Sequence, residues 1–332
     1  MVFLPPQCKV TLMNTRPLVL PELLPLLEEI PTVDLSPDSL PAFRDGLEQA
    51  AGQSFLQAED YPVILERLTI PATDTAPDLR LLSVRPRKDA TAPRTVLLHL
   101  HGGGYFAGQP ELTATQLCQF AQDLDCVVIS PDYRLTPEHP FPAAIEDAYT
   151  TLCWITRNAD TLGIDASRIG LTGESAGGGL AAGLALLTRD REGPTLLFQN
   201  LVYPVLDDRT TTGQPDASPV GGEFLWTRAS NTFMWTSLLN PVAPGSADVS
   251  PYAAPARATD LSDLPPTYLS VGALDLFLDE DLAYAQRLIH QGVSVELEIV
   301  PGACHIFDQT DTPVATRSIA RRIDAMKRGF GL

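Results

Sequence analysis

The chain has few basic residues and few cysteines, and it lacks a long apolar run. Of its 332 residues, 23 are Lys or Arg and 41 are Asp or Glu, which gives a formal net charge of −18. Surplus negative charge repels phosphate groups, so neither nucleic acid nor an anionic membrane surface is an expected partner. The longest apolar stretch, around residues 176–187, is too short and too rich in glycine to span a bilayer.

The five cysteines are Cys8, Cys118, Cys126, Cys153 and Cys304, and no two form a C-x-x-C pair. Their odd number and the lack of such a pair indicate neither a disulfide framework nor a zinc knuckle, and we expect four of them to be small buried side chains. Prolines interrupt the Leu-rich first 30 residues, which lack the basic region, apolar run and cleavage site of a signal peptide. We therefore expect a cytoplasmic protein.

Short apolar runs alternate with helical segments from residue 63 onward. We predict strands at residues 64–70, 79–84, 95–100, 126–130, 168–172, 197–203, 267–271 and 293–300, and helices at 113–124, 143–158, 176–191 and 282–291. Such alternation is typical of an α/β fold, a mostly parallel eight-stranded sheet with helices on both faces. The first two strands leave no room for a helix between them, so that edge is expected to be antiparallel.

Two regions, 1–55 and 207–250, do not follow this alternation. The second carries an aromatic cluster that includes Phe224, Trp226, Phe233 and Trp235. We predict that 1–55 and 207–250 form a helical cap on a core made of 56–206 and 251–332. The alternative is that the aromatic residues only hold a small helical subdomain together.

The strongest local motif is Gly173-Glu174-Ser175-Ala176-Gly177. A predicted strand ends at this motif and a glycine-rich helical segment begins after Ser175. A G-x-S-x-G sequence between a strand and a helix is the nucleophile elbow, in which the serine projects from a tight turn. Ser175 is therefore the candidate nucleophile.

A second motif, His101-Gly102-Gly103-Gly104-Tyr105, directly follows the predicted strand 95–100. Consecutive glycines let backbone N–H groups turn toward one point, as an oxyanion hole requires. The alternative is a phosphate-binding loop, but no G-K-[ST] or G-x-G-x-x-G sequence follows.

An activated serine needs a general base. The available histidines are His99, His101, His139, His290 and His305. His305 is the best candidate because it lies in a loop directly after the last predicted strand. The acid should lie between the serine and this histidine, after a strand; Asp275 fits, whereas Asp279 and Asp281 are expected at the start of the next helix.

Together these motifs resemble those of the bacterial hormone-sensitive-lipase-like family of α/β-hydrolase carboxylesterases. The resemblance covers about residues 60 to 310. It rests on segments 101–105, 132–138 with 141–144, 173–178, 275–280 and 305–307, which follow one another in the family's order. Two positions depart from the family: Glu174 stands where many members carry Asp, and Leu276 stands where Pro is common.

The resemblance implies acyl transfer by Ser175, His305 and Asp275, because the family's acid is the first Asp of the 275–280 segment. It also implies that the N–H groups of Gly103, Gly104 and Ala176 form the oxyanion hole. The expected substrate is a small short- to medium-chain ester, and the mechanism needs no metal and no organic cofactor.

Aromatic residues near the motifs are predicted to wall an acyl pocket: Tyr105, Phe106, Phe224 and Trp226. The triad alone does not separate an esterase from an amidase, a lactone hydrolase or a deacetylase. A more distant alternative is a non-catalytic small-molecule receptor on the same fold. The sequence does not decide the oligomeric state, and a homodimer is one possibility.

Overall fold

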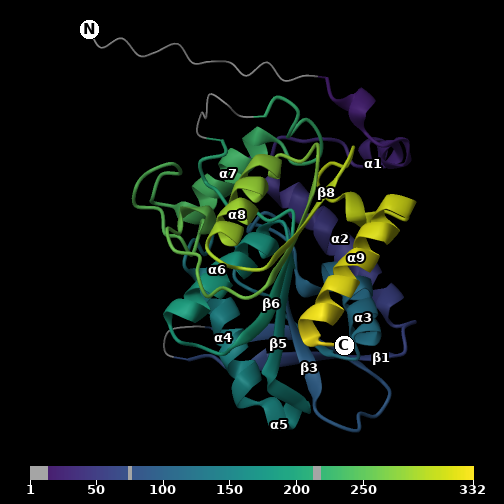
Figure 1. Ribbon diagram of the computed structural model, residues 1–332. Coiled ribbons are helices and arrows are strands. Elements are labelled where there is room, and N and C mark those ends of the chain that lie inside the picture. Colours follow the sequence, from purple (N-terminus) through teal and green to yellow (C-terminus); the bar gives the residue numbers. More distant parts are fainter. Residues whose placement is uncertain (1–13, 74–76, 212–217) are drawn as a thin grey trace.

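The computed structural model describes residues 14–73, 77–211 and 218–332, and within them the chain forms an eight-stranded sheet between layers of helices (Figure 1). The strands are β1 (Val63–Ile70), β2 (Leu79–Pro86), β3 (Arg94–Leu100), β4 (Val127–Pro131), β5 (Ile164–Glu174), β6 (Leu196–Val202), β7 (Thr267–Gly272) and β8 (Val295–Val300). Their order is β1-β2-β4-β3-β5-β6-β7-β8. The strand β2 pairs antiparallel with β1 and β4, and the remaining pairs are parallel, which confirms the predicted fold class.

Helices cover both faces of the sheet (Figure 1). One face packs against α3 (Ala114–Asp123) and α9 (Pro313–Phe330), and the other against α4 (Ala143–Arg157), α6 (Ala176–Asp190) and α8 (Leu278–His290). The remaining α-helices are α1 (Leu24–Glu29), α2 (Leu40–Ala58), α5 (Ala159–Leu162) and α7 (Arg228–Leu239). Short 3₁₀ turns occur at η1 (Arg16–Leu18), η2 (Pro21–Leu23), η3 (Pro110–Thr113), η4 (Pro255–Arg257) and η5 (Phe307–Gln309).

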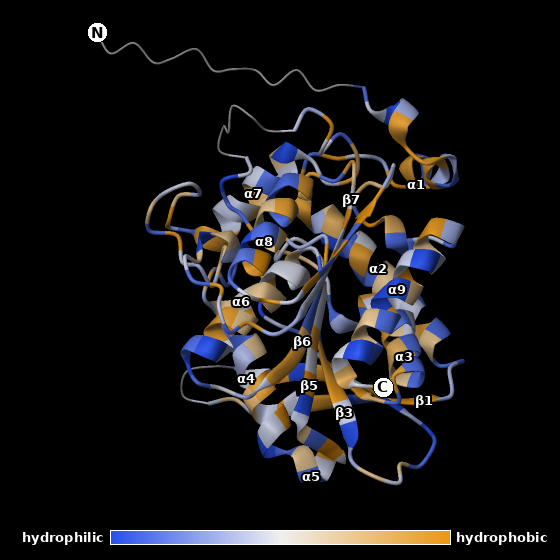
Figure 2. Cartoon of the chain, viewed as in Figure 1, coloured by the Kyte–Doolittle hydropathy of each residue, from blue (hydrophilic) through white to orange (hydrophobic). Residues whose placement is uncertain are grey.

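The central strands are apolar on both faces because both faces are covered. Along β3, Val96 and Leu98 join the core beneath α4 and α6, whereas Leu97 joins the core beneath α3 and α9. Successive side chains of a strand point to opposite faces, so an unbroken apolar run can fill two cores at once. In Figure 2 the inner strands are coloured mainly orange, the colour of hydrophobic residues.

The predicted element bounds need small corrections. Helix α8 begins at Leu278 rather than 282, with Asp279, Glu280 and Asp281 in its first turn, where acidic groups face the positive end of the helix dipole. At its other end, α8 finishes at His290, one residue before the predicted end.

The cysteines also differ from the expectation. Cys118, Cys126 and Cys304 are buried, but Cys153 is only half-buried. Cys8 lies outside the described residues. So does the rest of residues 1–13, the first part of the Leu-rich N-terminal segment that was expected not to be a signal peptide.

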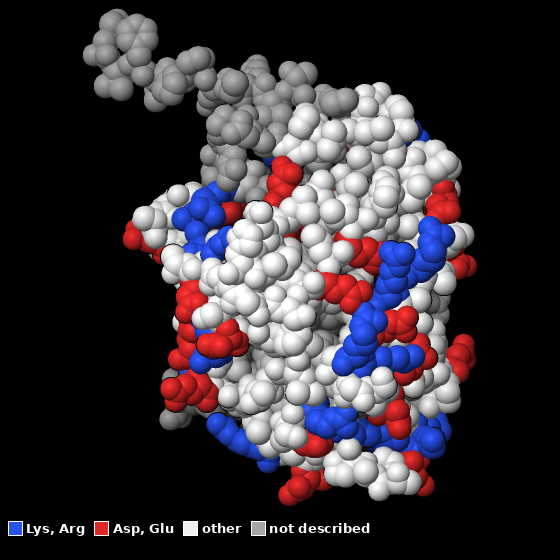
Figure 3. Space-filling model, in the orientation of Figure 1, with Lys and Arg blue, Asp and Glu red and all other residues white. Residues whose placement is uncertain are grey.

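Charged side chains of both signs are interspersed on the face shown in Figure 3. Among the surface ion pairs, Arg321 and Arg328 of α9 pair with Glu298 and Glu296 of β8. Within the described residues, no helix is both long and apolar enough to span a bilayer.

Asp281 is a fully buried carboxyl group on α8, and neither of its oxygens has a hydrogen-bond partner among the described residues. Burial, together with the nearby Glu280 and Asp275, raises its pKa well above the usual value. The folded protein therefore binds this proton more tightly than the unfolded chain does. Stability is lost as the pH rises from the unfolded pKa of about 3.9 toward the raised folded value.

We therefore expect Asp281→Asn, which cannot ionise, to raise the melting temperature by about 2 °C or more at pH 8 and by much less at pH 5. Thermal melts across this pH range check the prediction. Asp324→Asn, at an exposed position of α9, is the matched control and should show no such trend. A melting temperature of Asp281→Asn at or below that of the parent at pH 8 contradicts this account.

Candidate active site

Ser175 occupies a sharp turn between β5 and α6, with φ 55° and ψ −120°. The turn requires glycine on both sides. A Cβ on Gly173 would lie 2.3 Å from the carbonyl oxygen of Gly177, and one on Gly177 would lie 2.0 Å from that of Leu100. The backbone N–H of Ser175 donates to Val202 of β6 over 2.9 Å, which holds the strained residue against the sheet.

Three predicted site residues meet in one chain of hydrogen bonds. The Oγ of Ser175 lies 2.9 Å from Nε2 of His305, and Nδ1 of His305 lies 2.7 Å from Oδ2 of Asp275. All three side chains are buried. Asp275 follows β7 and His305 follows β8, so the C-terminal ends of parallel strands bring the three residues together.

Asp279 lies outside this chain of hydrogen bonds. It is exposed in the first turn of α8, and its Oδ2 accepts a hydrogen bond from the backbone N–H of Ser218 over 3.1 Å. The second oxygen of Asp275, by contrast, accepts from the backbone N–H of Phe277 over 3.1 Å. Of these two acids, the one expected to be the acid of the triad, Asp275, is the one that contacts the His305 ring.

Aromatic rings enclose the imidazole of His305. The ring centroid of Tyr203 is 4.6 Å away, that of Phe277 is 5.3 Å away and that of Trp226 is 6.1 Å away. The Tyr203 hydroxyl donates to Oδ1 of Asp308 over 2.5 Å, which ties β6 to the turn that follows His305. Sequence reasoning missed Tyr203 and Asp308, because nothing in the local pattern marks a tyrosine at the end of an apolar strand.

The glycine loop lies beside the serine. Gly103 and Gly104 have φ of 123° and 62°, in the region that favours glycine, and a Cβ on Gly103 would lie 2.1 Å from the carbonyl oxygen of Ala107. Among the described residues, neither the Gly103 N–H nor the Gly104 N–H donates to a backbone carbonyl. Ala176 is the first residue of α6, where an N–H has no partner within the helix.

The four predicted pocket residues lie in different surroundings. Trp226 lies against the glycine loop, because a Cβ on Gly104 would be 2.6 Å from its ring. The fully buried ring of Phe106 is 6.0 Å from that of Trp226. The hydroxyl of Tyr105 instead lies against Gly179 of α6, and Phe224 is a half-buried residue that packs on the core.

The other histidines have different surroundings. His101 is buried, its Nδ1 lies 2.8 Å from the Gly102 carbonyl oxygen, and burial lowers its pKa to about 4. His99 is bonded within the sheet to Ser130 and Glu174. The remaining two, His139 and His290, are exposed.

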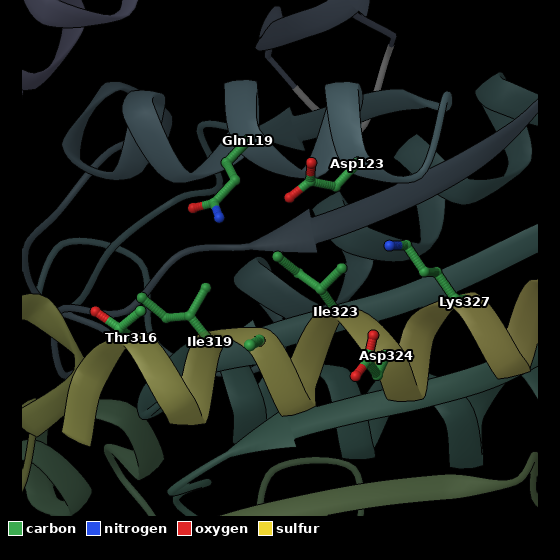
Figure 4. A pocket seen from close by; sticks show the side chains of 8 residues that line it. Gln119, Asp123, Thr316, Ile319, Ile323, Asp324 and Lys327 are labelled. Atoms are coloured by element: carbon green, nitrogen blue, oxygen red, sulfur yellow. The ribbon is translucent and has the colours of Figure 1, made fainter. Parts of the chain in front are cut away.

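Two cavities lie on the α3 face of the sheet. Figure 4 shows the first, of about 320 Å³ between α3 and α9, with the apolar side chains of Ile319 and Ile323 flanked by polar residues such as Gln119 and Lys327. The second, of about 390 Å³, lies between α2 and α3 and reaches Glu174. Across the described ranges, no cluster of three or more His, Cys, Asp or Glu side chains is suited to hold a metal ion.

Comparison with known proteins shows the family of this chain. The profile of a family described as alpha/beta hydrolase fold matches residues 97–309. Esterase LipI of Mycobacterium tuberculosis is 36% identical over 246 residues, which cover 72% of this chain and 73% of that protein. Carboxylesterase NlhH of the same species is 34% identical over 247 residues, with 71% and 74% covered.

A solved structure named Bacterial Heroin Esterase matches this one with a TM-score of 0.86 and 38% sequence identity, covering 96% of this chain and 99% of that one. These matches agree with the motifs from which the family was expected. The chain belongs to the hormone-sensitive-lipase-like family of carboxylesterases with the α/β-hydrolase fold.

Proposed function

We propose that this carboxylic ester hydrolase cleaves short- to medium-chain acyl esters through Ser175, His305 and Asp275. The observation that carries the proposal is the continuous set of hydrogen bonds from the Ser175 hydroxyl through the His305 ring to the Asp275 carboxylate. This order supplies a nucleophile, a general base in contact with it, and a group that orients the base.

In the proposed reaction, Nε2 of His305 takes the proton of Ser175 as Oγ attacks the ester carbonyl. Asp275 accepts the Nδ1 hydrogen bond and so holds the ring in the tautomer that leaves Nε2 free to accept. His305 then protonates the departing alcohol. Water attacks the acyl-enzyme in the same manner, and Ser175 is regenerated.

The negative charge of the tetrahedral intermediate needs nearby donors. We assign this role to the N–H groups of Gly103, Gly104 and Ala176, which flank the serine. A single donor of this kind is worth about 3 kcal/mol of barrier. The support is local geometry: a Cβ on Gly102 would lie 3.7 Å from Cβ of Ser175, so the loop lies next to the nucleophile.

The segments 1–55 and 207–250 are proposed to act as a cap that limits acyl length. Their described parts contact each other: Leu35 N–H donates to Oγ of Ser230 over 2.9 Å, and Thr227 Oγ1 donates to Asp34 over 2.7 Å. Trp226, adjacent to Thr227, extends from this contact to the glycine loop. Residues 1–13 and 212–217 of these segments lie outside the described residues.

The half-buried side chain of Arg44 fastens the first of these segments to the core. Arg44 of α2 donates from Nε to the carbonyl oxygen of Phe106 over 2.7 Å and from Nη2 to that of Thr136 over 2.8 Å. It also pairs with Glu138, and this hydrogen bond lowers the pKa of Glu138 to about 2. Sequence reasoning missed Arg44, because its partners lie more than 60 residues away in the chain.

The proposed triad predicts unequal effects of two similar substitutions. Ser175→Ala is expected to lower kcat at least about 10⁴-fold on p-nitrophenyl butyrate, and Asp275→Asn should be nearly as severe because the imidazole loses its orienting acceptor. Asp279→Asn, the matched control four residues away, should retain activity within about twofold. A greater loss in Asp279→Asn than in Asp275→Asn means that the acid is wrongly assigned.

The proposed acyl pocket predicts a change of chain-length preference. Each buried methylene of an acyl chain gains about 0.8 kcal/mol until the pocket is full, so kcat/KM should rise from acetyl toward butyryl or hexanoyl esters and collapse beyond about ten carbons. Trp226→Ala removes a wall and should move the maximum toward longer chains. Trp154→Ala on α4 is the control. An unchanged profile in Trp226→Ala rules this residue out of the acyl site.

A further inference from the structure

A buried network of polar side chains lies next to the nucleophile, on the sheet face that packs against α3 and α9. Glu174, the residue before Ser175, accepts a hydrogen bond through Oε2 from Nε2 of His99 over 2.9 Å. Nδ1 of His99 lies 2.9 Å from Oγ of Ser130 on β4. The second oxygen of Glu174 pairs with the Arg322 guanidinium of α9, and both of these side chains are buried.

The Glu174–His99 hydrogen bond connects β3 and β5 close to the end of their backbone pairing. The last backbone pair between β3 and β5 joins Leu100 to Gly173. Beyond this pair the two strands separate, one into the glycine loop and the other into the turn at Ser175. The side-chain bond therefore joins the two strands at the point where their backbone pairing ends.

Arg322 makes the burial of this carboxylate possible. Burial alone would raise the pKa of Glu174, but the interactions with Arg322 and His99 lower it to about 2. Arg322 also donates from Nε to Oδ1 of Asn200 over 2.8 Å and from Nη2 to Oγ1 of Thr172 over 2.7 Å. The charge of Glu174 is thus compensated inside the protein, and the carboxylate is fixed in one place.

We propose that Glu174 is a positioning residue which, through its hydrogen bond to His99, holds Ser175 in register with the N–H groups of Gly103 and Gly104. This inference rests on the proposed function. A displacement of about 1 Å between a nucleophile and the groups that stabilise its transition state can lower the rate about 100-fold. Loss of the Glu174–His99 hydrogen bond leaves the substrate contacts unchanged. We therefore expect it to lower kcat and to leave KM nearly unchanged.

Two double variants separate positioning from folding. Removing Glu174 alone leaves a buried, unpaired Arg322, which destabilises the protein for reasons unrelated to catalysis. Glu174→Met with Arg322→Met, and Glu174→Gln with Arg322→Met, both remove the two charges at nearly equal volume. They differ because Gln can still accept a hydrogen bond from His99 and Met cannot.

With p-nitrophenyl butyrate we expect kcat of the Met/Met variant to fall about 10- to 100-fold, with KM within about twofold of the parent. The Gln/Met variant should recover to within about fivefold of the parent kcat. Glu296→Gln, which breaks a surface Glu–Arg pair between β8 and α9, is the control and should match the parent. Thermal melts ensure that every variant is assayed well below its melting temperature.

Equal kcat values in the two double variants would overturn the positioning role, because the variants differ only in whether residue 174 can accept a hydrogen bond from His99. Failure of the proposed function has a different signature. In that case the parent shows no turnover of the ester, or Ser175→Ala turns it over as fast as the parent.

Discussion

The positive φ of Ser175 is the constraint on which the rest of the site depends. A non-glycine residue in such a conformation costs on the order of 1–3 kcal/mol and persists only where its surroundings fix it. Here the N–H of Ser175 donates to Val202, and its carbonyl oxygen accepts from Gly179 and Val205. Because β5 lies between β3 and β6, the strand that leads into the turn is paired on both sides.

Buried acids near the site differ in what their surroundings provide. Asp275 accepts hydrogen bonds from His305 and from a backbone amide, whereas Asp281 has no partner among the described residues. Glu280 accepts from the amides of Leu206 and Asp207, yet burial still raises its pKa well above the usual value. Burial thus disfavours the negative charge on both Glu280 and Asp281.

The sequence predicts the sheet and the meeting of Ser175, Asp275 and His305 because both follow from local rules. Strand and helix patterns are periodic, and residues that follow parallel strands gather at one edge of the sheet. Arg44, Tyr203 and Arg322 could not be found in this way. Their partners are distant in the chain, and a lone arginine on a helix or a tyrosine after a strand carries no local pattern.

In the aromatic cluster, too, local sequence patterns do not predict where each side chain lies, even for residues that are close together in the chain. Trp226 and Trp235 lie nine residues apart in one apolar region, and both belong to the aromatic cluster that the sequence places in the cap. Trp226 lies just before α7 and contacts the glycine loop, whereas Trp235 lies on α7 and is fully buried in the core. The direction of a side chain at a loop–helix junction depends on tertiary packing, which no periodicity encodes.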